Sequence, residues 1–151
     1  MSAENKTLVR RCFKEIWSKG NLAVADQIVA TNYVNHAPAS PVPDSGREGF
    51  KKNVTAYRTA FPDLTFTIDD ALAEGNKVTV RWTARGTHKG VLMGIAPTGK
   101  QITNTGISVI RITAGKLAEA WVTWDTLGMM QQLGAIPSLG RAAEQASSAT
   151  R

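Results

Sequence analysis

Hydrophobic positions in the first part of the chain recur with the period of an α-helix. One apolar stripe covers residues 4–19, and a shorter one follows Gly20 and Asn21, which end the first helix. The stripes consist of Leu8, Val9, Cys12, Phe13, Ile16 and Trp17, and then of Leu22, Ala25, Ile28 and Val29. Residues 31–38 are predicted to be extended and to run into a loop rich in proline, serine and glycine.

A third helix is predicted to begin at Ser45. Glu48 follows three residues later, as in a capping box, and Pro62 ends the helix. Its apolar positions keep helical spacing at Phe50, Val54, Tyr57 and Phe61.

After Pro62 the hydrophobic period changes to two, which is typical of strands. Strands are predicted at residues 64–68, 78–85, 103–113 and 117–125, with an irregular segment at 86–100 and a closing helical turn through Leu127, Met130 and Leu133. Helices followed by antiparallel strands indicate an α+β fold. Helices packed on the concave side of a curved sheet would leave a pocket between the two layers.

The last predicted strand has two different faces. One face carries Leu117, Glu119, Trp121, Thr123 and Asp125, and the other carries Ala118, Ala120, Val122 and Trp124. We expect the second, wholly apolar face to lie on the outside of the sheet, where a second subunit would cover it. The pattern therefore predicts a homodimer or a higher homo-oligomer.

The length of 151 residues suits one domain, predicted at residues 1–137 with a flexible tail at 138–151. The polar start and the lack of a long apolar run predict a cytoplasmic protein without membrane segments. The net charge of +6 raises the question of nucleic acid, but the basic residues are scattered and not interleaved with aromatic ones. We therefore expect no nucleic-acid partner; a mild positive field that attracts an anionic small substrate stays possible.

Asp125 is the first candidate for chemistry, because it ends an apolar strand next to Trp124. Partial burial there would favour the protonated carboxyl and make it a proton carrier. The spacing equally favours a structural role, since Asp125 precedes Thr126 and Gly128, where a helix can begin and need an N-cap. Spacing alone leaves both interpretations open.

His36 and His88 are the two histidines of the chain, and both lie in segments flanked by proline or glycine. This placement fits a pocket rim as well as an ordinary surface. The single cysteine, Cys12, excludes an intrachain disulfide, and the sequence contains no HxH or HExxH cluster that would predict a metal site. Its aromatic and methionine side chains fit a core or a cavity lining equally well.

Several spaced motifs resemble the SnoaL-like polyketide cyclases, also called ester cyclases. They are Tyr33-Val34-Asn35-His36, Gly86-Thr87-His88-Lys89-Gly90, Pro97-Thr98-Gly99-Lys100, the run from Gly115 to Trp121, Trp124-Asp125 with Gly128, and Gln132-Leu133-Gly134. The resemblance covers roughly residues 5–137. It implies the nuclear transport factor 2-like cone, in which three N-terminal helices pack on a curved mixed β-sheet and enclose an apolar pocket.

The resemblance also implies an activity: cofactor-independent intramolecular aldol cyclisation of a polyketide-like ester or related carbonyl compound. Asp125 would be the general acid/base, and His36 and His88 would assist by binding enolate oxygens. The residues expected to contact this apolar substrate are Tyr33, Asn35, Phe50, Tyr57, Trp82, Met93 and Trp121. Two alternatives stay open: a non-catalytic binding protein, and a cofactor-free isomerase, dehydratase or hydrolase on the same fold.

Overall fold

The computed structural model describes residues 2–37 and 46–137. Its elements follow the predicted order of helices first and strands afterwards. They are α1 (Ser2–Arg11), η1 (Cys12–Ser18), α2 (Ala23–Ile28), β1 (Val29–His36), α3 (Gly46–Ala60), β2 (Thr65–Glu74), β3 (Lys77–Thr87), β4 (Gln101–Thr113), β5 (Lys116–Trp124) and α4 (Thr126–Leu133). The predicted Ser45 cap and the tail at 138–151 lie outside the described residues.

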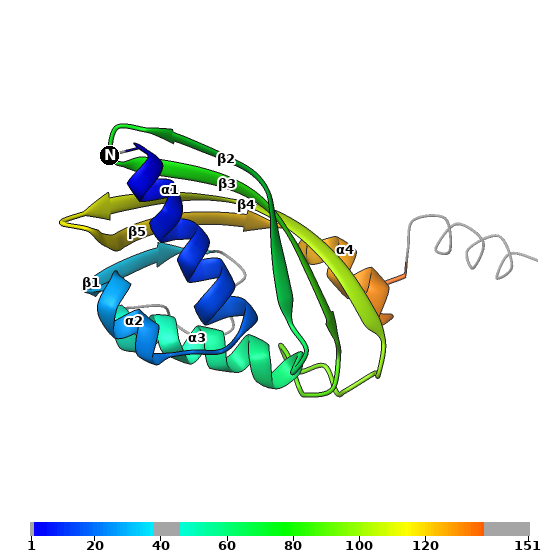
Figure 1. Ribbon diagram of the computed structural model, residues 1–151. Coiled ribbons are helices and arrows are strands. Elements are labelled where there is room, and N and C mark those ends of the chain that lie inside the picture. Colours follow the sequence, from blue (N-terminus) through cyan, green and yellow to red (C-terminus); the bar gives the residue numbers. More distant parts are fainter. Residues whose placement is uncertain (1, 38–45, 138–151) are drawn as a thin grey trace, which may run out of the picture.

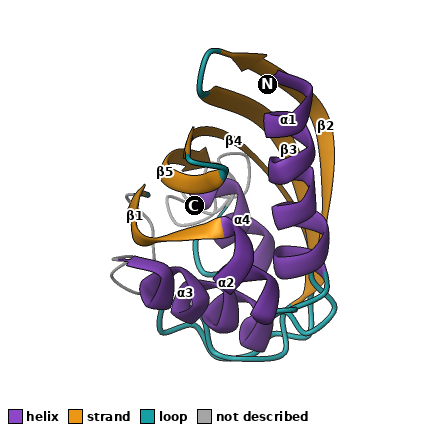
Figure 2. Ribbon diagram, turned by 60° about the vertical axis from the view of Figure 1, so that its left-hand side comes forward, coloured by secondary structure: helices purple, strands orange, loops and turns teal. Residues whose placement is uncertain are grey.

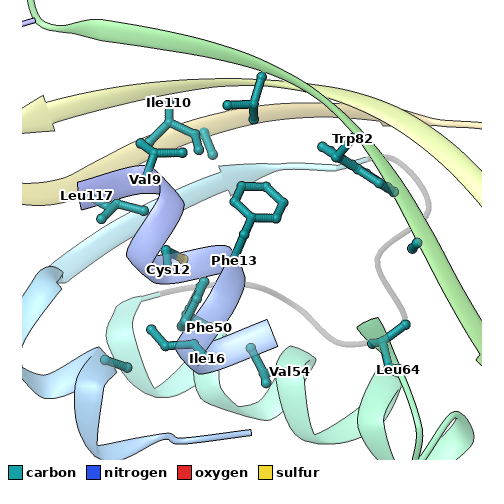
Figure 3. Close-up of a cluster of buried hydrophobic side chains, with 14 of the residues drawn as sticks. Val9, Cys12, Phe13, Ile16, Phe50, Val54, Leu64, Trp82, Ile110 and Leu117 are labelled. Atoms are coloured by element: carbon teal, nitrogen blue, oxygen red, sulfur yellow. The ribbon is translucent and has the colours of Figure 1, made fainter. Parts of the chain in front are cut away.

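The first predicted helix is a continuous element whose second half, η1, has the wider π-type hydrogen bonding. Its apolar stripe packs inward, and Figure 3 shows Val9, Cys12, Phe13 and Ile16 pointing into the core. Arg58 of α3 donates from Nη1 to the carbonyl oxygens of Trp17 and Ser18, at 2.8 and 2.9 Å. This contact satisfies carbonyls that a helix end leaves without partners.

Five strands form one mixed sheet in the order β1-β5-β4-β3-β2. The edge strand β1 runs parallel to β5, and the other neighbours are antiparallel. The sheet curves around the helices without closing, with α1, α2 and α3 on its concave side (Figures 1 and 2). The architecture is the predicted cone of helices on a curved mixed sheet.

The inner face of the sheet is mostly apolar because alternate residues of each strand meet the helices. On β3 the inward residues Val78, Val80, Trp82 and Ala84 are all buried, as their alternation predicted. On α4 the pattern is shifted from the prediction. The predicted helical turn ran through Leu127, Met130 and Leu133, whereas the buried residues of the helix are Met129 and Leu133, and Leu127 is 53% exposed.

From Ala120 onward, the two faces of β5 are the reverse of those expected. Before it the register with β4 shifts, so Leu117 also lines the inner cavity and Ala118 lies on the outer side. Ala120, Val122 and Trp124 face the inner layer, whereas Trp121 lies on the outer face and is 38% exposed. Three of the four residues of the expected apolar outer face are thus part of the interior, because they lie on the concave side of the sheet that the helices cover. The sequence argument for a dimer therefore does not hold, although the oligomeric state stays a prediction.

Candidate functional site

A cavity of about 130 Å³ lies between the helices and the inner face of the sheet. Aromatic side chains make up much of its wall: Phe13, Trp17, Tyr33, Phe50, Tyr57, Phe61, Phe66, Trp82 and Trp124. Figure 3 shows Phe13, Phe50, Leu64 and Trp82 between the helices and the sheet, with Leu64 in the connection from α3 to β2. Many of the rings meet edge to face, such as Phe66 and Trp82 with centroids 5.1 Å apart. An apolar cavity of roughly 150 Å³ holds a benzene-sized ligand.

Five of the seven residues expected to contact substrate line this cavity. Tyr33 and Asn35 come from β1, Phe50 and Tyr57 from α3, and Trp82 from β3. The structure therefore brings together residues that lie far apart in the sequence.

The other two expected contact residues, Met93 and Trp121, do not line the cavity. Met93 lies in the irregular segment between β3 and β4, where its φ of 50° places it in the left-handed region. Trp121 is on the outer face of β5, since the strand presents its opposite face to the helices. Neither residue therefore lies with the other five around the cavity, although Met93 packs against the hydrophobic core.

Strand β4 adds a polar band to the cavity through Asn104 and Ser108. The backbone N–H of Thr105 donates to Asn104 Oδ1 at 3.1 Å, and the Asn104 amide nitrogen has no partner among the described residues. Trp82 Nε1 donates to Ser108 Oγ at 3.0 Å. Between the two, Gly106 leaves room for the Trp82 indole, with which any side chain at this position would collide. These groups offer hydrogen-bond donors to a ligand oxygen inside a mostly apolar space.

Asn104 was not recognised in the sequence because both faces of β4 mix apolar and polar residues. Ile107 lies outward and is 50% exposed, while Asn104 and Ser108 lie inward and are buried. Hydropathy alone would have placed Ile107 on the inner face and Asn104 and Ser108 on the outer face. The pairing of β4 with β3 is the signal that would have identified Asn104 and Ser108. Gly106 lies opposite Trp82, and the residues two positions before and after Gly106 share its face of the sheet.

Asp125 is the N-cap of α4, as one of its two interpretations predicted. Its Oδ1 accepts a hydrogen bond from the backbone N–H of Gly128 at 2.8 Å. A side chain at Gly128 would collide with this carboxylate, so the glycine makes the close approach possible. The Asp125 side chain is exposed and does not line the cavity, whereas the adjacent Trp124 does. The burial expected for the carboxylate is therefore absent.

His36 lies at the end of β1 on the outer face of the sheet. Its ring stacks on Trp121 with centroids 5.3 Å apart, and its Nε2 is 2.8 Å from Glu119 Oε2. Arg111 donates to the other oxygen of Glu119 at 3.1 Å. These contacts hold the pKa of Glu119 below its ordinary value. The hydrogen bond to His36 contributes most, and the hydrogen bond to Arg111 follows. His36 thus ties β1 to β5 and does not reach the cavity.

His88 is fully buried, not at a pocket rim. Its Nδ1 accepts a hydrogen bond from the backbone N–H of Thr98 at 3.2 Å. Its ring packs against Phe61, which lines the cavity. The following residues, Lys89 and Gly90, donate backbone hydrogen bonds to the Ala60 carbonyl at the end of α3. His88 therefore fastens the segment between β3 and β4 and is not among the residues that line the cavity.

The cavity wall is electrically neutral. Among the lining residues that the structure describes there is no aspartate, glutamate, histidine, lysine or arginine. Its titratable groups are the phenols of Tyr33 and Tyr57 and the thiol of Cys12, and burial raises the pKa of Cys12 to about 12. Within residues 2–37 and 46–137, no three metal-ligating side chains gather and no helix is long and apolar enough to cross a membrane. The site can bind and orient an uncharged ligand.

Comparison with known proteins assigns the sequence to one family. The family model of the SnoaL-like polyketide cyclases matches residues 7–133. An aklanonic acid methyl ester cyclase from Streptomyces sp. (strain C5) is 30% identical over 129 residues, which cover 84% of this chain and 80% of the relative. The aklanonic acid methyl ester cyclase of Streptomyces peucetius is also 30% identical, over 84% of this chain and 88% of its own.

Solved structures agree with the sequence relatives. TsrD from Streptomyces laurentii superposes with a TM-score of 0.82 at 28% identity, covering 90% of this chain and 98% of its own. A proposed polyketide cyclase from Acidithiobacillus ferrooxidans superposes with a TM-score of 0.80 at 33% identity, covering 89% and 97%. With the fold, the cavity and the family match in agreement, the chain belongs to the SnoaL-like polyketide cyclase family.

Proposed function

We propose that this protein is a cofactor-independent cyclase that acts on a neutral, largely apolar carbonyl compound held in the aromatic cavity. The observation that carries the proposal is the cavity itself, with its aromatic wall and the open amide of Asn104. The reaction is an intramolecular aldol closure. A base removes a proton from a carbon flanked by carbonyls, the enolate carbon attacks a second carbonyl, and the new alkoxide takes up a proton. No atoms leave, so the product is an isomer.

The cavity supports this chemistry by holding and orienting the ligand. Folding a flexible substrate so that the two reacting carbons are near contact contributes up to about 7–11 kcal/mol in favourable cases. Asn104 and Ser108 are placed to donate hydrogen bonds to an oxygen that gains negative charge as the enolate forms. The electrically neutral wall favours an ester over the free acid, because a buried carboxylate would have no counter-charge.

Asp125 remains our proposed general acid/base. Support comes from its position at the end of β5, directly after the cavity-lining Trp124, and from the family resemblance. Its exposure and its cap hydrogen bond to Gly128 favour the second candidate function, a binding protein in which Asp125 only begins α4. The two functions make opposite predictions for one substitution.

Asp125→Asn separates the roles, because asparagine caps a helix as well as aspartate does but cannot carry the proton. With aklanonic acid methyl ester as the first substrate, we expect kcat to fall by about 10²–10⁴-fold with the melting temperature unchanged. Asp63→Asn is the matched control, since Asp63 is an exposed carboxylate that also accepts a backbone hydrogen bond, from Thr87 at 2.7 Å. Activity of Asp125→Asn within about threefold of the parent would refute the acid/base role.

A panel of substrates distinguishes the cyclase from other reactions on this fold. Turnover of the ester but not of hydroxy-ketones or epoxides supports cyclisation, and the reverse supports a dehydratase, isomerase or hydrolase. Binding of the ester without turnover of any panel member supports the binding protein. Comparison of the ester with its free acid tests the neutral cavity, and equal affinity would contradict it.

The homodimer also stays a proposal, now on different residues. Ile107 and Trp121 are exposed side chains on the outer face of neighbouring strands, 50% and 38% exposed. Light scattering should show a dimeric parent and a monomeric Ile107→Arg, whereas Thr55→Arg on the exposed surface of α3 should stay dimeric. A monomeric parent at micromolar concentration would rule the dimer out.

A further inference from the structure

A second hollow, which we call the β1 groove, opens where β1 leaves its ladder with β5. Val29 pairs with Leu117 and Val34 with Glu119, so β1 advances five residues while β5 advances two. The residues between them bulge out and border a groove of about 440 Å³. The β1 groove shares no lining residue with the aromatic cavity. Its wall has the opposite chemistry, since its polar members include Thr31, Asn32, Arg47, Arg111, Lys116 and Glu119.

Three cations in this groove are held in place by neighbouring oxygens. Arg47 donates from Nε to the carbonyl of Val29 at 2.8 Å, and Lys116 donates from Nζ to the carbonyl of Gln27 at 2.9 Å. These carbonyls orient the cations without neutralising them. Arg111 donates from Nη1 to the Thr113 hydroxyl at 2.6 Å. Each cation keeps further N–H groups beyond these bonds, because guanidinium carries five donors and ammonium three.

The charge of the groove is not balanced by its own acids. Glu119 is the one carboxylate among the described lining residues, and it contacts Arg111 at 3.1 Å. Just outside, Asp26 is 4.0 Å from Arg47 Nη1 but contacts Lys51 more closely, at 2.7 Å. His36 contacts Glu119 from the side of β1. Three cations against one carboxylate leave an excess of two positive charges in the wall.

We propose that the β1 groove binds the phosphate group of a small phosphate monoester. Such a group carries about −1.5 to −2 charges at neutral pH, which matches the excess. Its oxygens accept the forked N–H pattern of guanidinium and the point charge of an ammonium. The groove is larger than the ion alone, so it accommodates part of the esterified molecule. This site is independent of the proposed cyclase activity, and its test needs no turnover.

The experiment is a titration of the ¹⁵N-labelled full chain, followed by NMR. Methyl phosphate is the probe, and methyl sulfate, with the same shape but one negative charge, is the comparison. We expect saturable chemical-shift changes at the amides of Thr31, Asn32 and Lys116, none at the cavity residues Trp82 and Asn104, and weaker binding of the sulfate by about tenfold. Shifts that do not saturate, or equal binding of the two esters, overturn the proposal.

Two matched variants locate the site. Lys116→Gln should weaken methyl phosphate binding about tenfold, whereas Lys14→Gln, the same change on an exposed face of η1, should alter it less than about twofold. Glu119→Gln should strengthen binding, since it removes the one described carboxylate of the wall. Equal losses for the two lysine variants would show a general effect of net charge, and weaker binding by Glu119→Gln would show that this carboxylate does not oppose the anion. Either result overturns the site. Melting temperatures identify any variant that fails to fold.

Discussion

The inner and outer faces of the sheet differ in how they hold polar groups. On the inner face, Trp82 and Ser108 form a buried hydrogen bond in a wall without charged side chains. On the outer face, Glu119 lies between His36 and Arg111 in partly exposed ion pairs. The residue types usually searched for as catalysts lie mostly outside, while amides, hydroxyls and phenols lie inside. One face of the sheet thus lines a pocket that can select a ligand by shape and uncharged hydrogen bonds, and the opposite face carries charged side chains.

The largest expected difference between the faces is the cost of a new charge on β5. Ala120→Glu places an unpaired carboxylate on the buried inner face and should destabilise the fold by about 3–5 kcal/mol. Thr123→Glu, on the exposed outer face of the same strand, should change stability by less than about 0.5 kcal/mol. Urea unfolding measures both. Equal losses would mean that β5 does not separate an interior from a surface.

A smaller difference is expected for the loss of one hydrogen bond. Ser108→Ala leaves the indole N–H of Trp82 buried without a partner, which should cost about 1–3 kcal/mol. Thr83→Val on the outer face of β3 removes a hydrogen bond to Asp69 that water can replace, so the cost should stay near 0.5 kcal/mol. The comparison fails if the outer-face variant is the less stable of the two.

The smallest effect concerns the pH dependence of the outer face. Because the folded protein holds the pKa of Glu119 below its ordinary 4.5, the carboxylate stabilises the fold above that value. This contribution is lost as the pH falls through the lower, folded pKa. Glu119→Gln should therefore melt slightly lower than the parent at neutral pH and at the same temperature in acid.

Glu74→Gln is the control for this pH series, because Glu74 is an exposed carboxylate at the far edge of the sheet. It should leave the melting temperature unchanged at every pH. Added salt should reduce the Glu119 effect, since partly exposed ion pairs are screened. A parent–variant difference that persists in acid would show that the glutamine acts through shape and not through charge.

Local features of this protein could be predicted from the sequence because they depend on neighbours in the chain. The helical stripe from Val9 to Ile16 and the alternation of Val78, Val80 and Trp82 record which side chains are apolar at a fixed period. The cap at Asp125 follows from the residues just after it. The spaced motifs were also sufficient to identify the family, because they need only order and spacing.

The site could be predicted only in part, because side-chain direction depends on which face the sheet turns toward the helices. Both faces of β5 carry large apolar residues, so alternation could not decide between Trp121 and Trp124. The parallel pairing of β1 with β5 brings His36 to Glu119 across 83 residues and removes it from the cavity. The register of β4 with β3 places Asn104 opposite the buried Ala84 and hence inside, although Ile107, on the outer face of the same strand, is more apolar.

The sequence by itself therefore determined the elements, their order, the helix cap and the family. The tertiary structure alone decided which residues meet in the cavity and that its wall is neutral. The physical reason is that period and capping are properties of a short segment, whereas burial is a property of the whole packed layer. Moving a strand by one residue exchanges its faces without changing a single local preference.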